Sequence, residues 1–157
     1  MSLKNKVLIV LLIAFVSYLG NVFTSTSVNT WYLGLNLPSW TPPGAFIGIV
    51  WTIIYILLAV SIISVFSKYT NTERLRFIHI KRWFLINLIL NLLWSFVFIA
   101  NKAIFAGILV AALLTISVYI LIYLIRPVSR WSAVALYPYA IWTTFATILN
   151  IVIWTLN

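Results

Sequence analysis

The sequence predicts an all-α integral membrane protein, a bundle of five transmembrane helices with a long lid loop between the first two. Composition is the first observation behind this prediction: of 157 residues, 64% are hydrophobic and only 7% are charged. Soluble domains are about half apolar and roughly a quarter charged, so the composition excludes that class. The second observation is a set of five uncharged apolar stretches, each near the roughly 20 residues that a helix needs to cross a bilayer.

The predicted helices follow these stretches in order, within a single domain of residues 1–157. They cover residues 7–23, 44–66, 83–100, 103–125 and 131–156. A transmembrane barrel is not expected, because no stretch alternates apolar and polar residues over about ten positions. The first stretch follows Lys4 and Lys6 but lacks a small-residue cleavage site, so we expect a retained helix rather than a signal peptide.

The basic residues predict the orientation of the bundle. With five spans, the N-terminus and the connections 67–82 and 126–130 share one side, which carries nine of the ten Lys and Arg residues; Lys102 falls on the other side. Cytoplasmic loops of membrane proteins carry such an excess of basic residues. We therefore expect a multi-pass protein with its N-terminus in the cytoplasm and its C-terminus outside. The basic residues are explained by topology, and no nucleic-acid partner is expected.

The loop of residues 24–43 is the longest connection on the outer side, and it contains no charged residue. Long loops without regular structure are usually functional or disordered. Disordered segments are polar, whereas this loop is rich in large apolar side chains. These are Trp31, Tyr32, Leu33, Leu35, Leu37 and Trp40. We therefore expect the loop to fold over the outer ends of the helices as a lid.

Several kinds of chemistry are excluded by the residues that the chain lacks. There is no Cys and no Asp, and Glu73 and His79 are the only Glu and His. Disulfides, metal clusters, carboxylate pairs and hydrolytic triads cannot be assembled from this set, so we predict no metal site and no conventional catalytic site. Both residues fall in a basic connection, where we expect them to be solvated. No ionisable residue lies in a predicted span, which argues against proton-coupled transport.

Three tryptophans indicate a binding site inside the bundle. Trp51, Trp94 and Trp142 lie well within predicted spans, whereas the other tryptophans fall at span ends, where they form an interfacial belt, or in the lid. A buried indole N–H requires a hydrogen-bond acceptor, so three buried tryptophans imply polar partners or a ligand. The sequence therefore predicts a neutral, aromatic cavity suited to a flat apolar molecule.

Helical spacing places further candidates on the same faces as these tryptophans. On the second predicted helix this face comprises Trp51 and Tyr55. On the third it comprises Phe84, Asn87, Asn91, Trp94 and Phe98, and on the fifth Pro138, Trp142, Ala146 and Asn150. Spacing leaves open whether Asn87 and Asn91 bond neighbouring helices or line a ligand pocket. Pro138 is expected to kink the fifth helix and open space at mid-depth.

Small residues mark another face, on the fourth predicted helix. Ala103, Gly107, Ala111 and Thr115 recur at every fourth position. Such spacing allows two helices to approach closely, within one bundle or between subunits. We favour packing within the bundle.

Two long motifs resemble the translocator protein family, also known as tryptophan-rich sensory proteins, TspO or peripheral benzodiazepine receptors. The first is WYLGLNLPSWTPP at 31–43, followed by Trp51 and Tyr55. The second is LYPYAIWTTFATILN at 136–150, and NLLW at 91–94 also matches. The resemblance covers nearly the whole chain.

This resemblance implies a five-helix bundle, commonly a homodimer, with a pocket beneath the first loop. Members bind porphyrins, including protoporphyrin IX, and synthetic isoquinoline and benzodiazepine ligands; some bacterial members promote light-dependent porphyrin breakdown that needs pocket tryptophans. The pocket candidates implied here are Tyr32, Pro42, Trp51, Asn87, Trp142 and Ala146. Trp51 and Trp142 are the implied photochemical residues, and Trp40, Tyr55, Asn91 and Trp94 complete the predicted ligand site.

The chain departs from the animal members of that family at its C-terminus. They carry a basic residue after the fifth helix as part of a cholesterol-recognition pattern, and this chain ends IVIWTLN without one. Loose versions of the pattern elsewhere in the chain carry little information. The departure argues against specific cholesterol binding and favours a bacterial cell membrane.

The sequence leaves three functions open. The first is a tetrapyrrole-binding receptor or sensor, with protoporphyrin IX as a non-covalent ligand or substrate whose acidic groups point outward near Lys102. The second is a transporter of porphyrins or other hydrophobic molecules. The third is a scaffold that acts through its helix faces.

Overall fold

The chain folds into long helices that lie side by side. The structure, a computed structural model, describes residues 1–68 and 73–157, and these residues are helical or irregular, with no strand. The helices are α1 (Leu3–Ser27), η1 (Tyr32–Gly34), α2 (Gly44–Ser67), α3 (Arg74–Trp94), η3 (Ser95–Ala100), α4 (Ile104–Ile125), α5 (Arg130–Val134) and α6 (Tyr137–Leu156). Five helical segments are long and apolar enough to span a membrane, with α3 and η3 counted as one and α5 and α6 as another. The predicted all-α membrane class with five spanning helices is confirmed, whereas the lid loop stays a prediction.

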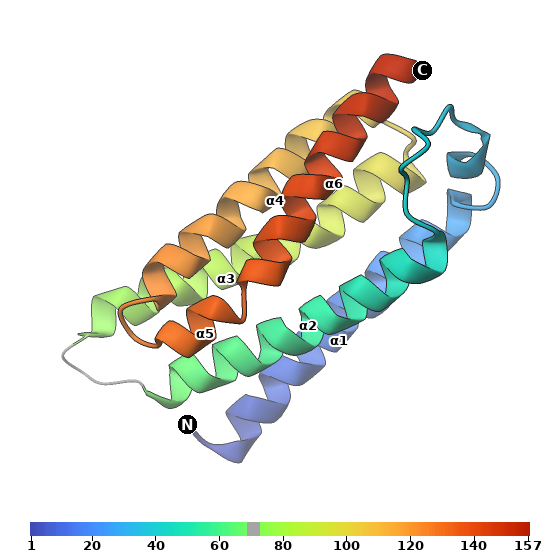
Figure 1. The fold of residues 1–157 in the computed structure, drawn as a ribbon. Helices are drawn as coiled ribbons and strands as arrows, with labels where there is room; N and C mark the ends of the chain where they lie inside the picture. The colour runs from blue at the N-terminus through green and yellow to red at the C-terminus, as the bar shows by residue number, and fades with distance from the viewer. Residues whose placement is uncertain (69–72) are drawn as a thin grey trace.

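Two helix groups form the bundle (Figure 1). Helix α4 packs against both α3 and α6, while α1 packs against α2, α3 and η3. The short helix α5 contacts α2 and α4 and closes the end of the bundle that carries the N-terminus. The C-terminus lies at the opposite end, beside the connection between α1 and α2.

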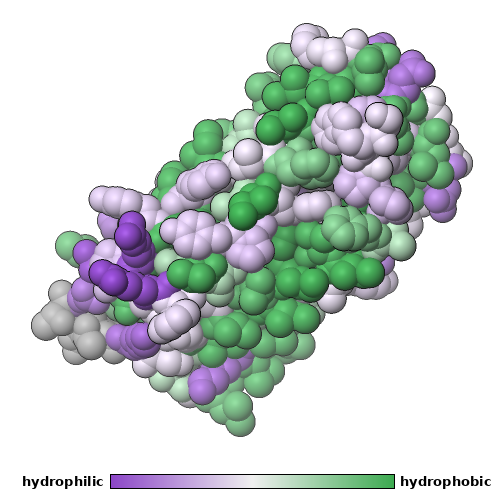
Figure 2. Space-filling model, viewed as in Figure 1, coloured by the Kyte–Doolittle hydropathy of each residue, from purple (hydrophilic) through white to green (hydrophobic). Residues whose placement is uncertain are grey.

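The surface is apolar along the sides of the bundle and hydrophilic toward its ends (Figure 2). The most hydrophilic residues gather at the end where α2 stops and α3 begins. Large apolar side chains such as Leu8, Phe15, Ile56 and Ile89 are more than half exposed. A soluble monomer rarely exposes so much apolar surface, whereas lipid accommodates it. The orientation of the bundle in the membrane stays a prediction.

Two helices extend further than hydropathy predicts. Helix α1 covers Leu3–Ser27 rather than residues 7–23, so the connection to α2 is shorter than predicted, at residues 28–43. Helix α3 begins at Arg74, so the predicted connection 67–82 is largely wrong; its residues 69–72 lie outside the described part of the chain. His79 is exposed, as predicted, but on a helix. Hydropathy marks only the apolar part of a span, and Lys and Arg are good helix formers that extend α1 and α3 at their N-terminal ends. At the C-terminal end of α1, the hydroxyls of Thr24, Ser25 and Thr26 bond carbonyls within the helix.

The last predicted helix, residues 131–156, is divided in two. Helix α5 ends at Val134, and α6 starts at Tyr137 with Pro138 in its first turn. Proline has no backbone N–H to donate, and the first turn of a helix does not require one. The break therefore lies near the end of the span rather than at mid-depth, where the sequence predicted it. Leu136 and Tyr139 fill the bend and are almost completely buried.

The small-residue face of α4 packs inside the bundle. Gly107 lies against Phe98 of η3, and Ala111 is buried. Thr115 lies within hydrogen-bond distance of Thr147 on α6, with 3.1 Å between the hydroxyl oxygens. These contacts agree with packing within one chain.

Gly107 provides a test of this packing. A methyl group at this position would lie 2.8 Å from both Cβ and Cδ2 of Phe98. We expect Gly107→Ala to destabilise the protein by about 1–3 kcal/mol through overpacking, measured by thermal unfolding in detergent. The matched control is Gly48→Ala, because a methyl at Gly48 meets nothing within 4 Å. If both variants unfold at the wild-type temperature or above, the close approach of η3 and α4 is contradicted.

Candidate functional site

A cavity of about 1110 Å³ lies in the half of the bundle nearer the C-terminus. Helices α1, α2, α3 and α6, together with η3 and the 28–43 connection, contribute its walls. Ligand sites in proteins usually measure about 300–1,000 Å³ and are mostly apolar. The cavity is therefore large enough for a molecule at or above the size of a typical drug.

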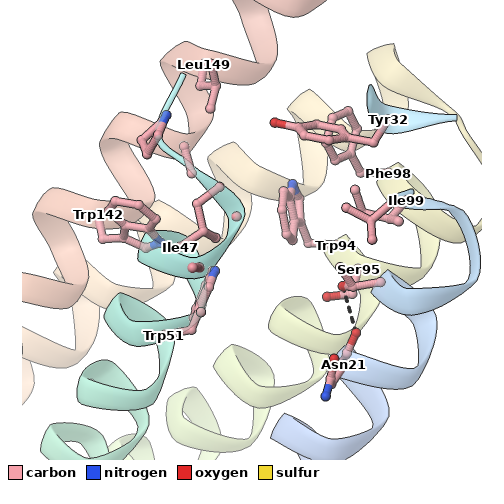
Figure 3. Close-up of a pocket in the computed structure, with 18 of the residues that line it drawn as sticks. Asn21, Tyr32, Ile47, Trp51, Trp94, Ser95, Phe98, Ile99, Trp142 and Leu149 are labelled. Carbon is pink, nitrogen blue, oxygen red and sulfur yellow. Dashed lines mark hydrogen bonds between the residues drawn. The ribbon is translucent and has the colours of Figure 1, made fainter. Parts of the chain in front are cut away.

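The cavity collects most of the predicted site residues. Its walls include Tyr32, Pro42, Trp51, Tyr55, Asn91, Trp94, Trp142 and Ala146. Trp142 stands on one side of the labelled group and Trp94 on the other, with Trp51 below and between them and Tyr32 near the upper end of Trp94 (Figure 3). Whether a ligand touches these residues stays a prediction.

Two predicted site residues, Trp40 and Asn87, do not line the cavity. Trp40 is 46% exposed, and its ring meets the edge of Phe145, which does line it. Asn87 is fully buried behind the wall, where it bonds Tyr139 and Ser117. Helical spacing placed Asn87 on the correct face of its helix, but α4 and α6 cover that face at this depth.

Sequence reasoning missed the wall that α1 contributes. Ser17, Gly20, Asn21 and Thr24 line the cavity from this helix. Their spacing of three and four residues forms one small and polar face on an otherwise apolar span, and this pattern could have identified the wall. It also missed Phe145 and Leu149 on α6.

The aromatic rings form a connected cluster around Trp51. Its ring stacks on Tyr55 with 5.7 Å between the centroids, meets the edge of Tyr139 at 6.1 Å and lies 6.4 Å from Trp94. Trp94 in turn stacks on Phe98 at 5.4 Å. Aromatic pairs contribute about 0.5–1.5 kcal/mol each beyond the area that they bury. These contacts fix the orientation of the ring that forms the floor of the cavity.

A chain of buried hydrogen bonds continues from the cavity into the bundle. Tyr55 donates to Asn91 at 2.7 Å, and Asn91 donates to Tyr139 at 3.0 Å. Tyr139 donates to Asn87 at 3.1 Å, and Asn87 donates to Ser117 at 2.8 Å. Asn87 therefore bonds neighbouring helices, whereas Asn91 takes part in the chain and also lines the cavity. Both asparagines therefore bond neighbouring helices, and a role in ligand binding stays a prediction for Asn91.

Three buried donors at the cavity have no hydrogen-bond partner among the described residues. They are Nε1 of Trp94, Nε1 of Trp142 and Nδ2 of Asn150, and all three residues contribute to the walls. A buried donor without a partner costs about 1–3 kcal/mol. A ligand or water that offers acceptor atoms would remove that cost.

None of the residues that line the cavity carries a charged side chain. Lys102, the predicted partner of acidic ligand groups, is exposed in the turn between η3 and α4 with a φ of 59°, and it does not contribute to the walls. Burial raises the pKa of Tyr32 above its ordinary value, so this phenol stays neutral at physiological pH. The cavity is therefore suited to ligand groups that carry no charge.

The connection between α1 and α2 is joined to the end of α6. The side chain of Asn157 accepts a hydrogen bond from the backbone N–H of Asn36 at 2.9 Å and donates to its carbonyl at 3.2 Å. The side chain of Asn36 donates to the carbonyl of Leu156 at 3.2 Å. These bonds hold residues 28–43 against the bundle, and the predicted role of this segment as a lid stays a prediction.

The fold and the cavity together define a helical membrane protein with an aromatic, uncharged internal site. A model of the TspO/MBR family matches residues 8–155, so the chain belongs to the TspO/MBR family.

Individual relatives match over nearly the whole chain. The tryptophan-rich protein TspO of Bacillus cereus is 31% identical over 156 residues, covering 98% of this chain and 97% of the relative. The tryptophan-rich protein TspO of Archaeoglobus fulgidus is 33% identical over 158 residues, covering 100% and 99%. Protein CrtK of Rhodobacter capsulatus is 33% identical over 131 residues, covering 83% and 81%.

The hydrogen-bond chain predicts unequal costs for two conservative substitutions. Tyr139→Phe leaves two buried partners unpaired, Nδ2 of Asn91 and Oδ1 of Asn87, whereas Tyr55→Phe leaves only Oδ1 of Asn91 unpaired. Each unpaired group costs about 1–3 kcal/mol, so we expect Tyr139→Phe to lower the unfolding free energy about twice as much. Thermal or denaturant unfolding in detergent measures both. Equal effects would contradict the connected chain.

The bonds between Asn36 and Asn157 predict how strongly the connection 28–43 is protected from amide hydrogen exchange. We expect Asn157→Ala to increase amide hydrogen exchange within residues 28–43, because it removes the two bonds that the Asn157 side chain makes with the backbone of Asn36. Thr155→Ala is the matched control, since the Thr155 side chain bonds only within α6, to the carbonyl of Val152. Unchanged exchange in Asn157→Ala would show that these two bonds do not hold the connection, which would then depend on its apolar contacts and on the bond from Asn36 to the Leu156 carbonyl.

Proposed function

We propose that this chain is a membrane receptor or sensor that binds flat, largely apolar aromatic molecules in the cavity. The observation that carries the proposal is the cavity itself, about 1110 Å³ of uncharged space bordered by Trp51, Trp94 and Trp142. Such a site offers ring faces for stacking and indole N–H groups for orientation. A tetrapyrrole such as protoporphyrin IX is the first candidate ligand, and isoquinoline- and benzodiazepine-type molecules are further candidates.

The relatives support this proposal through their names. One relative, from Cereibacter sphaeroides, is called a tryptophan-rich sensory protein and is 29% identical over 129 residues. A sensor needs a ligand site and a membrane location, and it does not need conventional catalytic groups.

The depth of the cavity favours a receptor over a transporter. Its walls end near Tyr55 and Asn91, and the half of the bundle beyond them is filled by buried apolar residues such as Leu58, Ile62 and Leu121. Interiors packed in this way leave no continuous passage for a large ligand. A passage to the other end of the bundle would require a rearrangement of the helices.

We further propose that Trp51 and Trp142 take part in light-driven oxidation of bound porphyrin, with dissolved dioxygen as the oxidant that accepts the electrons. Both indoles contribute to the walls of the cavity, so one flat ring inside it can approach both (Figure 3). The three unpartnered donors support binding of such a ligand, because uncharged acceptor atoms on it would pair them.

The first test is binding and light-driven loss of protoporphyrin IX. We expect the porphyrin to quench tryptophan fluorescence saturably, and its absorbance to fall faster under light and air with the protein than without it. Trp51→Phe combined with Trp142→Phe retains aromatic rings but removes the indoles, so we expect this double variant to abolish most of the light-driven loss.

The control variants separate binding from photochemistry. Trp83→Phe combined with Trp131→Phe removes two indoles that do not line the cavity, and light-driven loss should match that of the wild type. Loss that is unchanged in the Trp51 and Trp142 variant refutes the photochemical role. Quenching that fails to saturate refutes the receptor proposal.

A further inference from the structure

The buried hydrogen-bond chain has a direction, and one contact at its far end sets it. Oγ of Ser117 lies 2.6 Å from the carbonyl oxygen of Leu114, in the same helix. A carbonyl oxygen can only accept, and a serine hydroxyl has a single proton. The Ser117 proton is therefore committed to Leu114, and the Ser117 oxygen can only accept from Asn87.

Each following member of the chain is then determined in turn. Asn87 must direct its NH₂ group toward Ser117, so its Oδ1 faces Tyr139 and accepts from that hydroxyl. The Tyr139 oxygen in turn accepts from the NH₂ group of Asn91. Oδ1 of Asn91 is left to face Tyr55, and the Tyr55 hydroxyl must donate to it.

The opposite direction of donation is not possible, because the bond from Ser117 to the Leu114 carbonyl prevents it. If both asparagine amides were reversed, Ser117 would have to donate to Asn87 and to Leu114 with one proton. All the hydroxyl protons in the chain therefore point away from the cavity. Tyr55, the member at the cavity wall, retains oxygen lone pairs but has no proton to offer. Donation along such a chain also strengthens the first oxygen as an acceptor.

We propose that Tyr55 is a specificity-determining residue that selects ligands carrying an N–H or O–H donor opposite its hydroxyl oxygen. The inference rests on the proposed function, because it requires an aromatic ligand in this cavity. With this assignment, the cavity walls offer an acceptor at Tyr55 and unpartnered donors at Trp94, Trp142 and Asn150. The preferred ligand is a flat apolar molecule with a donor on one edge and an acceptor on another.

Carbazole and N-methylcarbazole form a suitable probe pair, because they differ only in the N–H donor. We expect the wild-type protein to bind carbazole about threefold to tenfold more tightly, the range for one neutral hydrogen bond. Quenching of tryptophan fluorescence in detergent gives both dissociation constants. Tyr55→Phe keeps the ring and removes the oxygen, so the preference should disappear in this variant. A preference caused by the bulk of the methyl group, or by detergent partitioning, would persist in it.

A remote variant tests the direction of the chain. Ser117→Ala removes the hydroxyl that fixes the direction, so the side-chain amides of Asn87 and Asn91 can both reverse. Tyr55 then has a free proton to donate, and the preference for carbazole should fall toward unity. Ser61→Ala is the matched control, since Ser61 is an equally buried serine that donates to the carbonyl of Ser132 outside the chain. The control should keep the wild-type preference.

The outcomes separate this inference from the function on which it rests. If both carbazoles bind the wild type equally, or if the preference survives Tyr55→Phe, the role of Tyr55 is refuted and the receptor proposal stands. If the preference survives Ser117→Ala, the direction assigned to the chain is refuted. If neither carbazole binds while protoporphyrin IX does, the role of Tyr55 is refuted and the receptor proposal stands. If protoporphyrin IX also fails to bind, the receptor proposal and the inference fail together.

Discussion

The requirement that polar groups inside an apolar bundle be paired shapes this structure. Hydrocarbon offers no hydrogen bonds, so the buried Tyr55, Asn91, Tyr139, Asn87 and Ser117 pair with one another. These residues come from four helices, so the hydrogen bonds also fix the depth at which the helices meet. The cavity begins where this pairing ends, and the buried donors without partners are found at its walls.

The same constraint links the rigid part of the protein to its site. Tyr55 and Tyr139 are held by Asn91, and both rings contact Trp51. The orientation of the Trp51 ring is therefore maintained by hydrogen bonds that it does not make itself. In contrast, the cavity wall formed by residues 28–43 is attached through exposed bonds at Asn36 and through aromatic contacts. A stable floor beside a less firmly attached wall would suit the proposed binding of large apolar molecules.

Much of the site could be predicted because helices impose regular spacing. Residues on one face, such as Asn91 and Trp94, remain neighbours whatever the rest of the fold does. Spacing does not reveal which helix covers a face, so it left the role of Asn87 open. The family resemblance placed Asn87 in the pocket, although α4 and α6 enclose it. Trp40 was assigned from its position in an aromatic loop, and its 46% exposure depends on the path of that loop.

The sequence by itself determined the class of protein, the number of spans and the uncharged aromatic character of the site, because hydropathy and composition are properties of each segment alone. Only the tertiary structure decided the ends of the helices, the break before Pro138, the wall that α1 contributes and the direction of the hydrogen-bond chain. These features depend on which atoms meet across helices, and that information belongs to the packed bundle.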